Sequence, residues 1–202
     1  MRRAVVIAAG LLVFSSLASG QQKSTSVSGA PTKEQKIQNA MRAAPATIAS
    51  KATIMDWTAK EGDKPVVLRQ GSNGWTCFPD FPATEGNDPM CLDEVWMAWM
   101  DAYVTHKEPR ITHVGIAYMI APGGASGSNT DPYATKQTPD NEWGFDPPHT
   151  MVLVPNADAL KGLPTDRKSG GPWVMYRGTP YVHIMVPVSS TAAPSRARTS
   201  GK

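Results

Sequence analysis

The sequence predicts an α+β fold in which a mostly antiparallel sheet forms a single domain. Three observations lead to this expectation. Five or more short segments have the composition of β-strands, few helical patterns lie between them, and most connections are too short for the crossover helices that parallel strands need. We expect residues 51–188 to form this globular domain, which is close to the commonest size for one domain.

Residues 1–20 have the pattern of a cleavable secretory signal peptide. An Arg-Arg pair is followed by the uncharged, apolar residues 4–14, and Ala18 and Gly20 give the small-residue spacing of a cleavage site. The alternative is a buried first helix of the domain. The apolar run is shorter than the roughly 20 residues that span a bilayer, so we expect no membrane anchor after cleavage. This pattern predicts a periplasmic or secreted protein.

The two ends of the mature chain differ from its middle. We expect residues 21–50 to hold a linker and a short N-terminal helix, because Thr32 and Gln35 have the spacing of a capping box. Residues 189–202 are basic and poor in large apolar side chains, which predicts a disordered tail.

The strands of the domain are predicted from short runs of β-branched, aromatic and apolar residues between turn signals. In chain order they are 52–57, 66–69, 75–78, 114–120, 150–154, 173–176 and 181–186. A short helix is expected near residues 156–161.

One long amphipathic helix is expected at about residues 88–107. Asp88 is a suitable N-cap, Pro89 suits the first helical position, and Pro109 ends the pattern. Apolar side chains recur at spacings of three and four residues, which predicts a stripe that faces the core. The stripe consists of Leu92, Trp96, Trp99, Met100, Tyr103 and Val104. A functional aromatic box is the alternative interpretation of its two tryptophans.

A long polar loop is expected at about residues 122–148, where Gly, Ser, Asn, Thr, Asp and Pro dominate. Irregular loops of this length are usually functional or disordered. Its aromatic residues, among them Tyr133 and Trp143, favour a loop that packs against something.

Charge argues against one class of partner. The whole chain has 20 Lys and Arg against 17 Asp and Glu, a net charge of +3. Residues 51–188 hold 11 Lys and Arg against 16 Asp and Glu, which leaves this domain at −5. A nucleic-acid surface needs clustered basic side chains, so we expect no nucleic-acid partner.

Cys77 and Cys91 are the only cysteines. In an exported protein an even count favours a disulfide, here between the end of a strand and the first turn of the long helix. A closed loop of about 15 residues would stabilise the fold by roughly 3 kcal/mol. The alternative is a redox pair with a thiol of lowered pKa at a helix N-terminus.

A repeated His-x-Met pattern is the most distinctive chemical signal. His149 and Met151 form one pair and His183 and Met185 the other, each within a predicted strand. A period of two places the His and Met of a pair on one face and the β-branched residues on the other, which we expect to be the core face. If the strands are neighbours, the four side chains form a soft donor set suited to copper as Cu(I). The alternative is ordinary packing of Met and His in a core.

Enzyme signatures are mostly missing. Residues 124–128 resemble a G-x-S-x-G nucleophile elbow, but the fifth residue is Ser and no helix pattern follows, so we reject it. A small hydrolase that uses His149, His183 and Asp131 is the alternative to a binding domain, with His113 in the same pool of polar side chains. The Asp131-Pro132 pair is equally suited to starting a turn.

Four strings of the sequence carry a family resemblance. They are residues 73–77, 86–91, 128–132 and 180–185. Together they resemble a family of secreted bacterial proteins without an assigned activity. The resemblance covers most of residues 52–188 and implies a bacterial, extracytoplasmic setting. The resemblance does not choose between the functions. From the residues, the leading hypothesis is a non-catalytic extracytoplasmic binding domain for a small ligand or a soft metal, with its site on the polar loop and the His and Met face.

Overall fold

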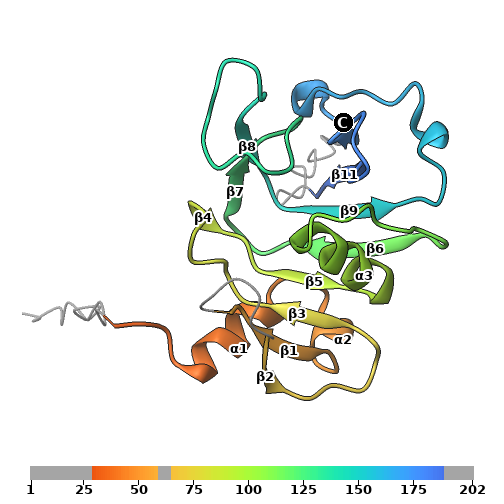
Figure 1. Ribbon diagram of the computed structural model, residues 1–202. Helices are drawn as coiled ribbons and strands as arrows, with labels where there is room; N and C mark the ends of the chain where they lie inside the picture. The colour runs from red at the N-terminus through yellow and green to blue at the C-terminus, as the bar shows by residue number, and fades with distance from the viewer. Residues whose placement is uncertain (1–28, 59–64, 189–202) are drawn as a thin grey trace, which may run out of the picture. The chain divides into compact units, whose positions relative to one another are not determined.

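A large sheet organises the protein. The computed structural model describes residues 29–58 and 65–188, and within these ranges eight strands pair in the order β10-β11-β9-β6-β5-β3-β1-β2 (Figure 1). The pairs are antiparallel except for β1 and β3, which run parallel. The strands are β1 Thr53–Asp56, β2 Val66–Arg69, β3 Thr76–Phe78, β5 Met90–Leu92, β6 Gly115–Met119, β9 His149–Leu153, β10 Trp173–Met175 and β11 His183–Pro187. The predicted α+β class and mostly antiparallel sheet are confirmed.

A second, smaller sheet includes two strands from the segment expected to be one polar loop. Strands β4 (Gly86–Asn87), β7 (Gly124–Gly127) and β8 (Gly144–Asp146) pair antiparallel in that order. A Cβ atom on Gly124 would lie 2.2 Å from the carbonyl oxygen of Asp146, so glycine is needed for these strands to approach. The expectation of a loop across residues 122–148 was therefore wrong at both ends, because glycine here makes close strand pairing possible.

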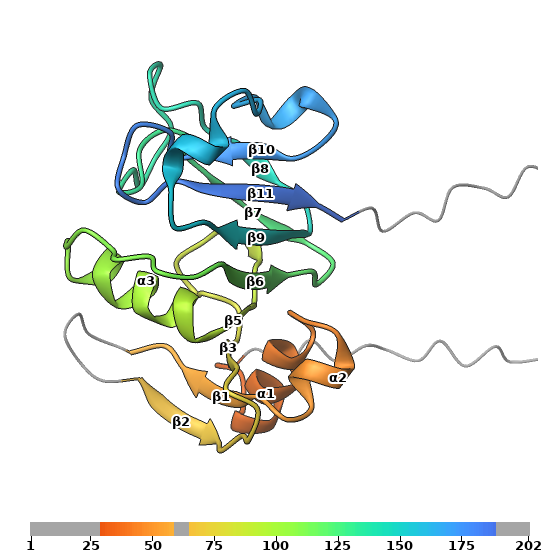
Figure 2. The same cartoon turned by 90° about the vertical axis from the view of Figure 1, so that its right-hand side faces the viewer.

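The helices lie on opposite faces of the large sheet. Figure 2 shows α3 (Glu94–Val104) on one side, with α1 (Lys33–Met41) and α2 (Ala46–Ala49) on the other. The predicted capping box of α1 is present, with the Thr32 hydroxyl oxygen 3.2 Å from the Gln35 amide nitrogen, from which it accepts a hydrogen bond. Two short 3-10 helices, η1 (Ala157–Leu160) and η2 (Arg167–Ser169), follow β9.

The predicted long helix at residues 88–107 is shorter than expected. Helix α3 begins at Glu94, and its N-cap is Asp93, whose carboxylate accepts a hydrogen bond from the amide of Trp96. Residues 90–92 form β5 instead of a first helical turn. Asp88 and Pro89 imitate a helix start in the sequence, but pairing of β5 with both β3 and β6 decides the local conformation.

Two buried clusters fill the two sides of the large sheet. The cluster beneath α1 and α2 is built from small residues: Ala40, Ala43, Ala44, Ala49, Ala52, Ile54, Cys77 and Cys91. The cluster beneath α3 is built from large ones: Phe78, Leu92, Trp96, Trp99, Ala117, Met151, Leu153, Trp173, Met175, Tyr181 and Met185. Of the predicted helix stripe, Trp96 and Trp99 are buried, whereas Val104 is 53% exposed.

The chain divides into two units, residues Met1–Ala30 and Pro31–Lys202. All elements described above belong to the second unit. The predicted signal peptide, most of the linker and the predicted tail lie outside the described residues. Among the described residues, no helix has the length and apolar character needed to cross a membrane.

Candidate functional site

The two His-x-Met strands are neighbours. Strands β9 and β11 pair antiparallel, and their register sets Met151 directly opposite Met185. Partners of this kind share a face, with Cβ atoms about 4.5–5.5 Å apart. His149 lies opposite Pro187, and His183 lies two residues before Met185 on β11. The two methionines therefore meet in the middle, and the two histidines flank them at opposite ends.

This surface of the sheet, the His–Met face, is buried. His149 is 3% exposed, Met151 8%, His183 2% and Met185 2%. The intervening β-branched side chains of β9 and β11 are half-buried. The expectation that the β-branched face is the core face was wrong. Helix α3 packs against the His–Met side, and the alternation of side chains along a strand does not reveal which side a helix covers.

Both imidazoles are held in the same way. The Nδ1 atom of His149 lies 2.6 Å from the carbonyl oxygen of Pro147, and that of His183 lies 2.9 Å from the carbonyl oxygen of Tyr181. A carbonyl only accepts, so each Nδ1 carries the proton and each Nε2 carries a free lone pair. Both Nε2 atoms are buried and have no hydrogen-bond partner among the described residues.

The two histidines are neutral over the physiological pH range. Burial lowers the pKa of His149 to about 4, although its bond to the Pro147 carbonyl acts in the opposite direction. Burial likewise lowers the pKa of His183 to about 4, the bond to Tyr181 opposes this, and nearby His149 lowers it further. A neutral imidazole with a free nitrogen is the form that binds a metal.

Strand register adds two methionines that the sequence analysis missed. Met119 of β6 lies opposite His149, and Met175 of β10 lies opposite His183. Each histidine thus has one methionine opposite it on a neighbouring strand and another two residues further along its own strand. The resulting sets are His149 with Met119 and Met151, and His183 with Met175 and Met185. Only strand order could have revealed the added pair, because neither Met119 nor Met175 belongs to a His-x-Met motif.

Aromatic rings surround His183. The centroid of its ring is 5.2 Å from that of Trp96, 5.7 Å from that of Trp99 and 5.4 Å from that of Tyr176, all edge to face. The indole nitrogens of Trp96 and Trp99 are buried without a hydrogen-bond partner among the described residues. This half of the His–Met face is therefore buried and rich in polarisable side chains.

The other predicted site residues do not join the histidines. Asp131 is exposed, and its carboxylate accepts a hydrogen bond from the amide of Tyr133. His113 is exposed and contacts the hydroxyl of Thr112 at 2.9 Å. Trp143 is half-buried. Tyr133 alone reaches towards the site, through a 2.6 Å contact between its hydroxyl and that of Tyr181.

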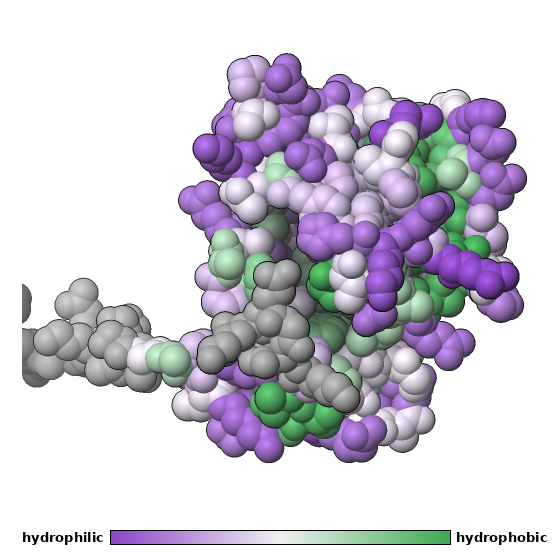
Figure 3. All heavy atoms as spheres, in the orientation of Figure 1, coloured by the Kyte–Doolittle hydropathy of each residue, from purple (hydrophilic) through white to green (hydrophobic). Residues whose placement is uncertain are grey.

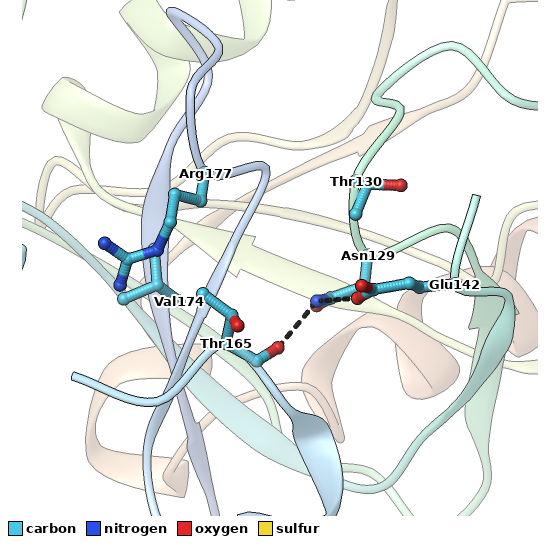
Figure 4. Close-up of a pocket in the computed structure, with 6 residues that line it drawn as sticks. All are labelled: Asn129, Thr130, Glu142, Thr165, Val174 and Arg177. Carbon is cyan, nitrogen blue, oxygen red and sulfur yellow. Dashed lines mark hydrogen bonds between the residues drawn. The ribbon is translucent and has the colours of Figure 1, made fainter. Parts of the chain in front are cut away.

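The predicted polar loop borders a small cavity of about 210 Å³ (Figure 4). Asn129 donates hydrogen bonds to the Glu142 carboxylate at 3.0 Å and to the Thr165 carbonyl at 2.7 Å. Arg177 turns its guanidinium away from Glu142 and donates to the Leu163 carbonyl at 2.9 Å. The polar lining is thus largely engaged in holding the loop.

A buried ion pair fixes the same region. Arg167 and Asp146 lie 2.9 Å apart with side chains about one-tenth exposed. Burial raises the pKa of the Asp146 carboxyl to about 6, although the charge of Arg167 acts to lower it. The pair joins β8 to η2 and has no contact with either histidine among the described residues. We assign it to the structure of the loop.

The predicted disulfide between Cys77 and Cys91 is confirmed. It joins directly opposite residues of β3 and β5, not a strand and a helix as expected. The redox alternative loses its basis, because no helix begins at Cys91. Disulfides persist in oxidising compartments, so the bridge is consistent with an extracellular protein.

One face of the molecule is drawn in Figure 3. Hydrophilic residues cover much of it, and hydrophobic residues form separate patches.

The His–Met face is not an open surface, because its two histidines and Met151 and Met185 are at most 8% exposed. Among the described residues, no three His, Cys, Asp or Glu side chains gather in a way that could hold a metal ion. Metal binding on the His–Met face would therefore depend on methionine sulfur.

Comparison with known proteins adds no further guide to the site. No family model, no curated protein and no solved structure matches the chain. The resemblance to secreted bacterial proteins remains a prediction.

Proposed function

We propose that this protein is a non-catalytic, periplasmic or secreted binding domain for a soft metal ion, Cu(I). The observation that carries the proposal is the pair of buried imidazoles with free Nε2 atoms on the same face as paired methionines. Thioether sulfur and imidazole nitrogen together favour Cu(I) over hard cations such as Mg²⁺ or Ca²⁺.

The hydrogen bonds at Nδ1 support this proposal independently. Histidines that bind metals almost always donate their second ring N–H to a carbonyl, a carboxylate or water, which fixes the tautomer and the ring orientation. Here the carbonyls of Pro147 and Tyr181 would provide that support for His149 and His183. A buried polar atom without a partner costs about 1–3 kcal/mol in stability. An apolar side chain would fill the same space without this cost, so the unpaired Nε2 atoms favour a role beyond packing.

Two three-donor sets follow from the register. His183, Met175 and Met185 would form the first, beneath the aromatic rings of α3. His149, Met119 and Met151 would form the second. Neither set carries a formal charge, so the bound ion would keep its positive charge among buried, polarisable side chains.

Anaerobic titration of the purified mature protein with Cu(I), in competition with a colorimetric chelator, tests the proposal. Silver(I) serves as a second probe because it resembles Cu(I) and does not change oxidation state. We expect about two equivalents of either ion per chain, one for each donor set. We expect Met175→Leu to weaken binding at one site by at least about 10–100-fold, the loss seen when support around a metal ligand is removed.

Met55→Leu is the matched control. Met55 packs against the same core from β1, but its cross-strand partner on β2 is Val67, which is not a histidine or a proposed ligand. The control should bind both ions with wild-type affinity. Absence of stoichiometric binding, or unchanged affinity after His183→Ala, would contradict the proposal.

The hydrolase alternative remains a prediction without a supporting contact. It requires Asp131 to act with the two histidines, and no hydrogen bond or ion pair joins them among the described residues. Activity against ester or peptide substrates that disappears in Asp131→Asn would support it against the metal-binding proposal.

A further inference from the structure

A row of aromatic rings leads from His183 towards the surface. Ring centroids lie 5.7 Å apart between His183 and Trp99, 5.2 Å between Trp99 and Tyr103, and 5.1 Å between Tyr103 and Tyr133. The Trp99 and Tyr103 rings are nearly parallel, at 7°, and those of Tyr103 and Tyr133 are at 16°. The row begins at a side chain that is 2% exposed and ends at one that is 37% exposed.

Hydrogen bonds hold this row in place. The Tyr103 hydroxyl donates to the Pro132 carbonyl at 2.6 Å. The Tyr133 hydroxyl lies 2.6 Å from that of Tyr181, which in turn donates to the Lys107 carbonyl at 3.0 Å. Three tyrosines from separate parts of the chain are thereby fixed together, which is more order than simple packing of a surface loop requires.

The end of α3 extends the row by one more ring. His106 follows the helix C-cap with a φ of 54°, the left-handed conformation that commonly ends a helix. Its ring stacks on Tyr133 with centroids 4.2 Å apart. His106 is exposed, so a small molecule in solution can approach the outer end of the row.

We propose that Trp99, Tyr103 and Tyr133, named here the aromatic path, carry single electrons between copper at His183 and an external one-electron acceptor. The inference rests on the proposed copper site. Tryptophan and tyrosine are the aromatic side chains most easily oxidised by one electron, and stacked neighbours divide one long transfer into short steps. A path of this kind would let a buried ion change oxidation state without leaving the protein.

The electron and the proton are both accounted for with the external acceptor as the single co-reactant. Tyr133 gives an electron to the acceptor and its phenolic proton to water. An electron from Cu(I) then passes through Trp99 and Tyr103 to Tyr133, which takes a proton back from water. The net change is oxidation of Cu(I) to Cu(II) and reduction of the acceptor by one electron, and no bond to carbon forms or breaks.

The test measures how fast bound Cu(I) is oxidised. Protein loaded anaerobically with Cu(I) is mixed with hexachloroiridate(IV), an outer-sphere oxidant, and Cu(II) is followed by stopped-flow absorbance and paramagnetic resonance. We expect Trp99→Phe and Tyr103→Phe to slow the oxidation by about tenfold or more, equivalent to about 1.4 kcal/mol in activation free energy. Tyr133→Phe, at the exposed end, should show the same direction; it keeps an aromatic ring at this position and removes the hydroxyl contact with Tyr181.

Trp75→Phe is the matched control. Trp75 packs with the small-residue cluster on the other side of the sheet, and its ring centroid lies 5.5 Å from that of Tyr118, away from His183. Cu(I) bound to this variant should be oxidised at the wild-type rate. Wild-type rates in all three path variants, with copper content unchanged, would overturn the aromatic path alone. Failure of the wild-type protein to bind Cu(I) would overturn the proposed function, and the path would fall with it.

Discussion

The two sides of the large sheet solve the same packing problem with different side chains. One side, the alanine face, packs α1 and α2 against small residues and a disulfide. The other side, the His–Met face, packs α3 against methionines, aromatic rings and two histidines. Both are buried. In the described part of the chain, the buried side-chain polar atoms without a hydrogen-bond partner lie on the His–Met face, on α3 packed against it, or in the ion pair of the loop.

The two faces differ in whether their buried side chains could bind a metal ion. Small residues let the helices approach the alanine face closely, its buried cluster contains no histidine, and the thioether of Met41 beside it accepts a hydrogen bond from Arg69. The His–Met face holds two nitrogen lone pairs at a cost in free energy that an apolar residue would avoid. We therefore expect substitutions on the alanine face to change stability alone, and substitutions on the His–Met face to change metal binding as well.

The largest effect on this comparison should come from removing the disulfide. Cys77→Ala combined with Cys91→Ala should lower the free energy of unfolding by about 3 kcal/mol, because the bridge closes a loop of about 15 residues in the unfolded chain. Chemical denaturation measures the loss. The affinity of the folded variant for Cu(I) should not change. A loss of affinity together with the loss of stability would mean that changes on the alanine face alter the His–Met face. Labelling of the wild-type protein should find no reactive thiol.

A smaller effect should appear in the pH dependence of stability. Burial lowers the pKa of His183 to about 4 from an ordinary value of 6.5, so the unfolded chain binds this proton more readily. The stabilisation is complete above pH 6.5 and is lost as the pH falls towards 4. Between pH 7 and pH 5 the metal-free wild-type protein should lose about 2 kcal/mol at this residue, a loss that His183→Asn lacks.

Urea denaturation of both proteins at the two pH values measures this difference. Asp88 and Asp146, whose pKa burial raises to about 6, act in the opposite direction but are common to both proteins. His113→Asn, at an exposed position, should keep the wild-type pH dependence. Equal losses in wild type and His183→Asn would show that His183 is not buried in its neutral form.

The smallest effect should come from the cap of α1. Thr32→Ala removes one half of the capping box and should cost about 1 kcal/mol in the free energy of unfolding. Thermal unfolding measures it. Thr32→Ser, which keeps the hydroxyl, should recover most of the loss. No change in Cu(I) affinity is expected, because α1 packs on the alanine face, on the other side of the sheet from the His–Met face.

The sequence predicted most elements of the fold because their signals are local. The capping box of α1, the strand Val66–Arg69 and the cysteine pairing all depend on residues close in the chain. Strand β5 was missed because Asp88 and Pro89 are equally good at starting a helix. The small sheet was missed because its glycines have the composition of a loop.

The candidate site was predicted only in part, for the same reason. Period-two alternation placed each His beside its Met, but which face is covered depends on where α3 packs. Met119 and Met175 enter the site through strand order, which connects segments far apart in the sequence. The free Nε2 atoms depend on ring orientation, and no sequence pattern encodes it.

The position of β11 within the sheet sets the order in which the site is assembled. This strand lies between β10 and β9 and brings His183 and Met185 from late in the chain. A chain made from its N-terminus can build the alanine face, the disulfide and α3 first, whereas long-range strand pairing comes more slowly. The proposed metal site would be completed last, and a fragment cut before residue 183 would lack His183 and Met185 but keep the donor set of His149, Met119 and Met151.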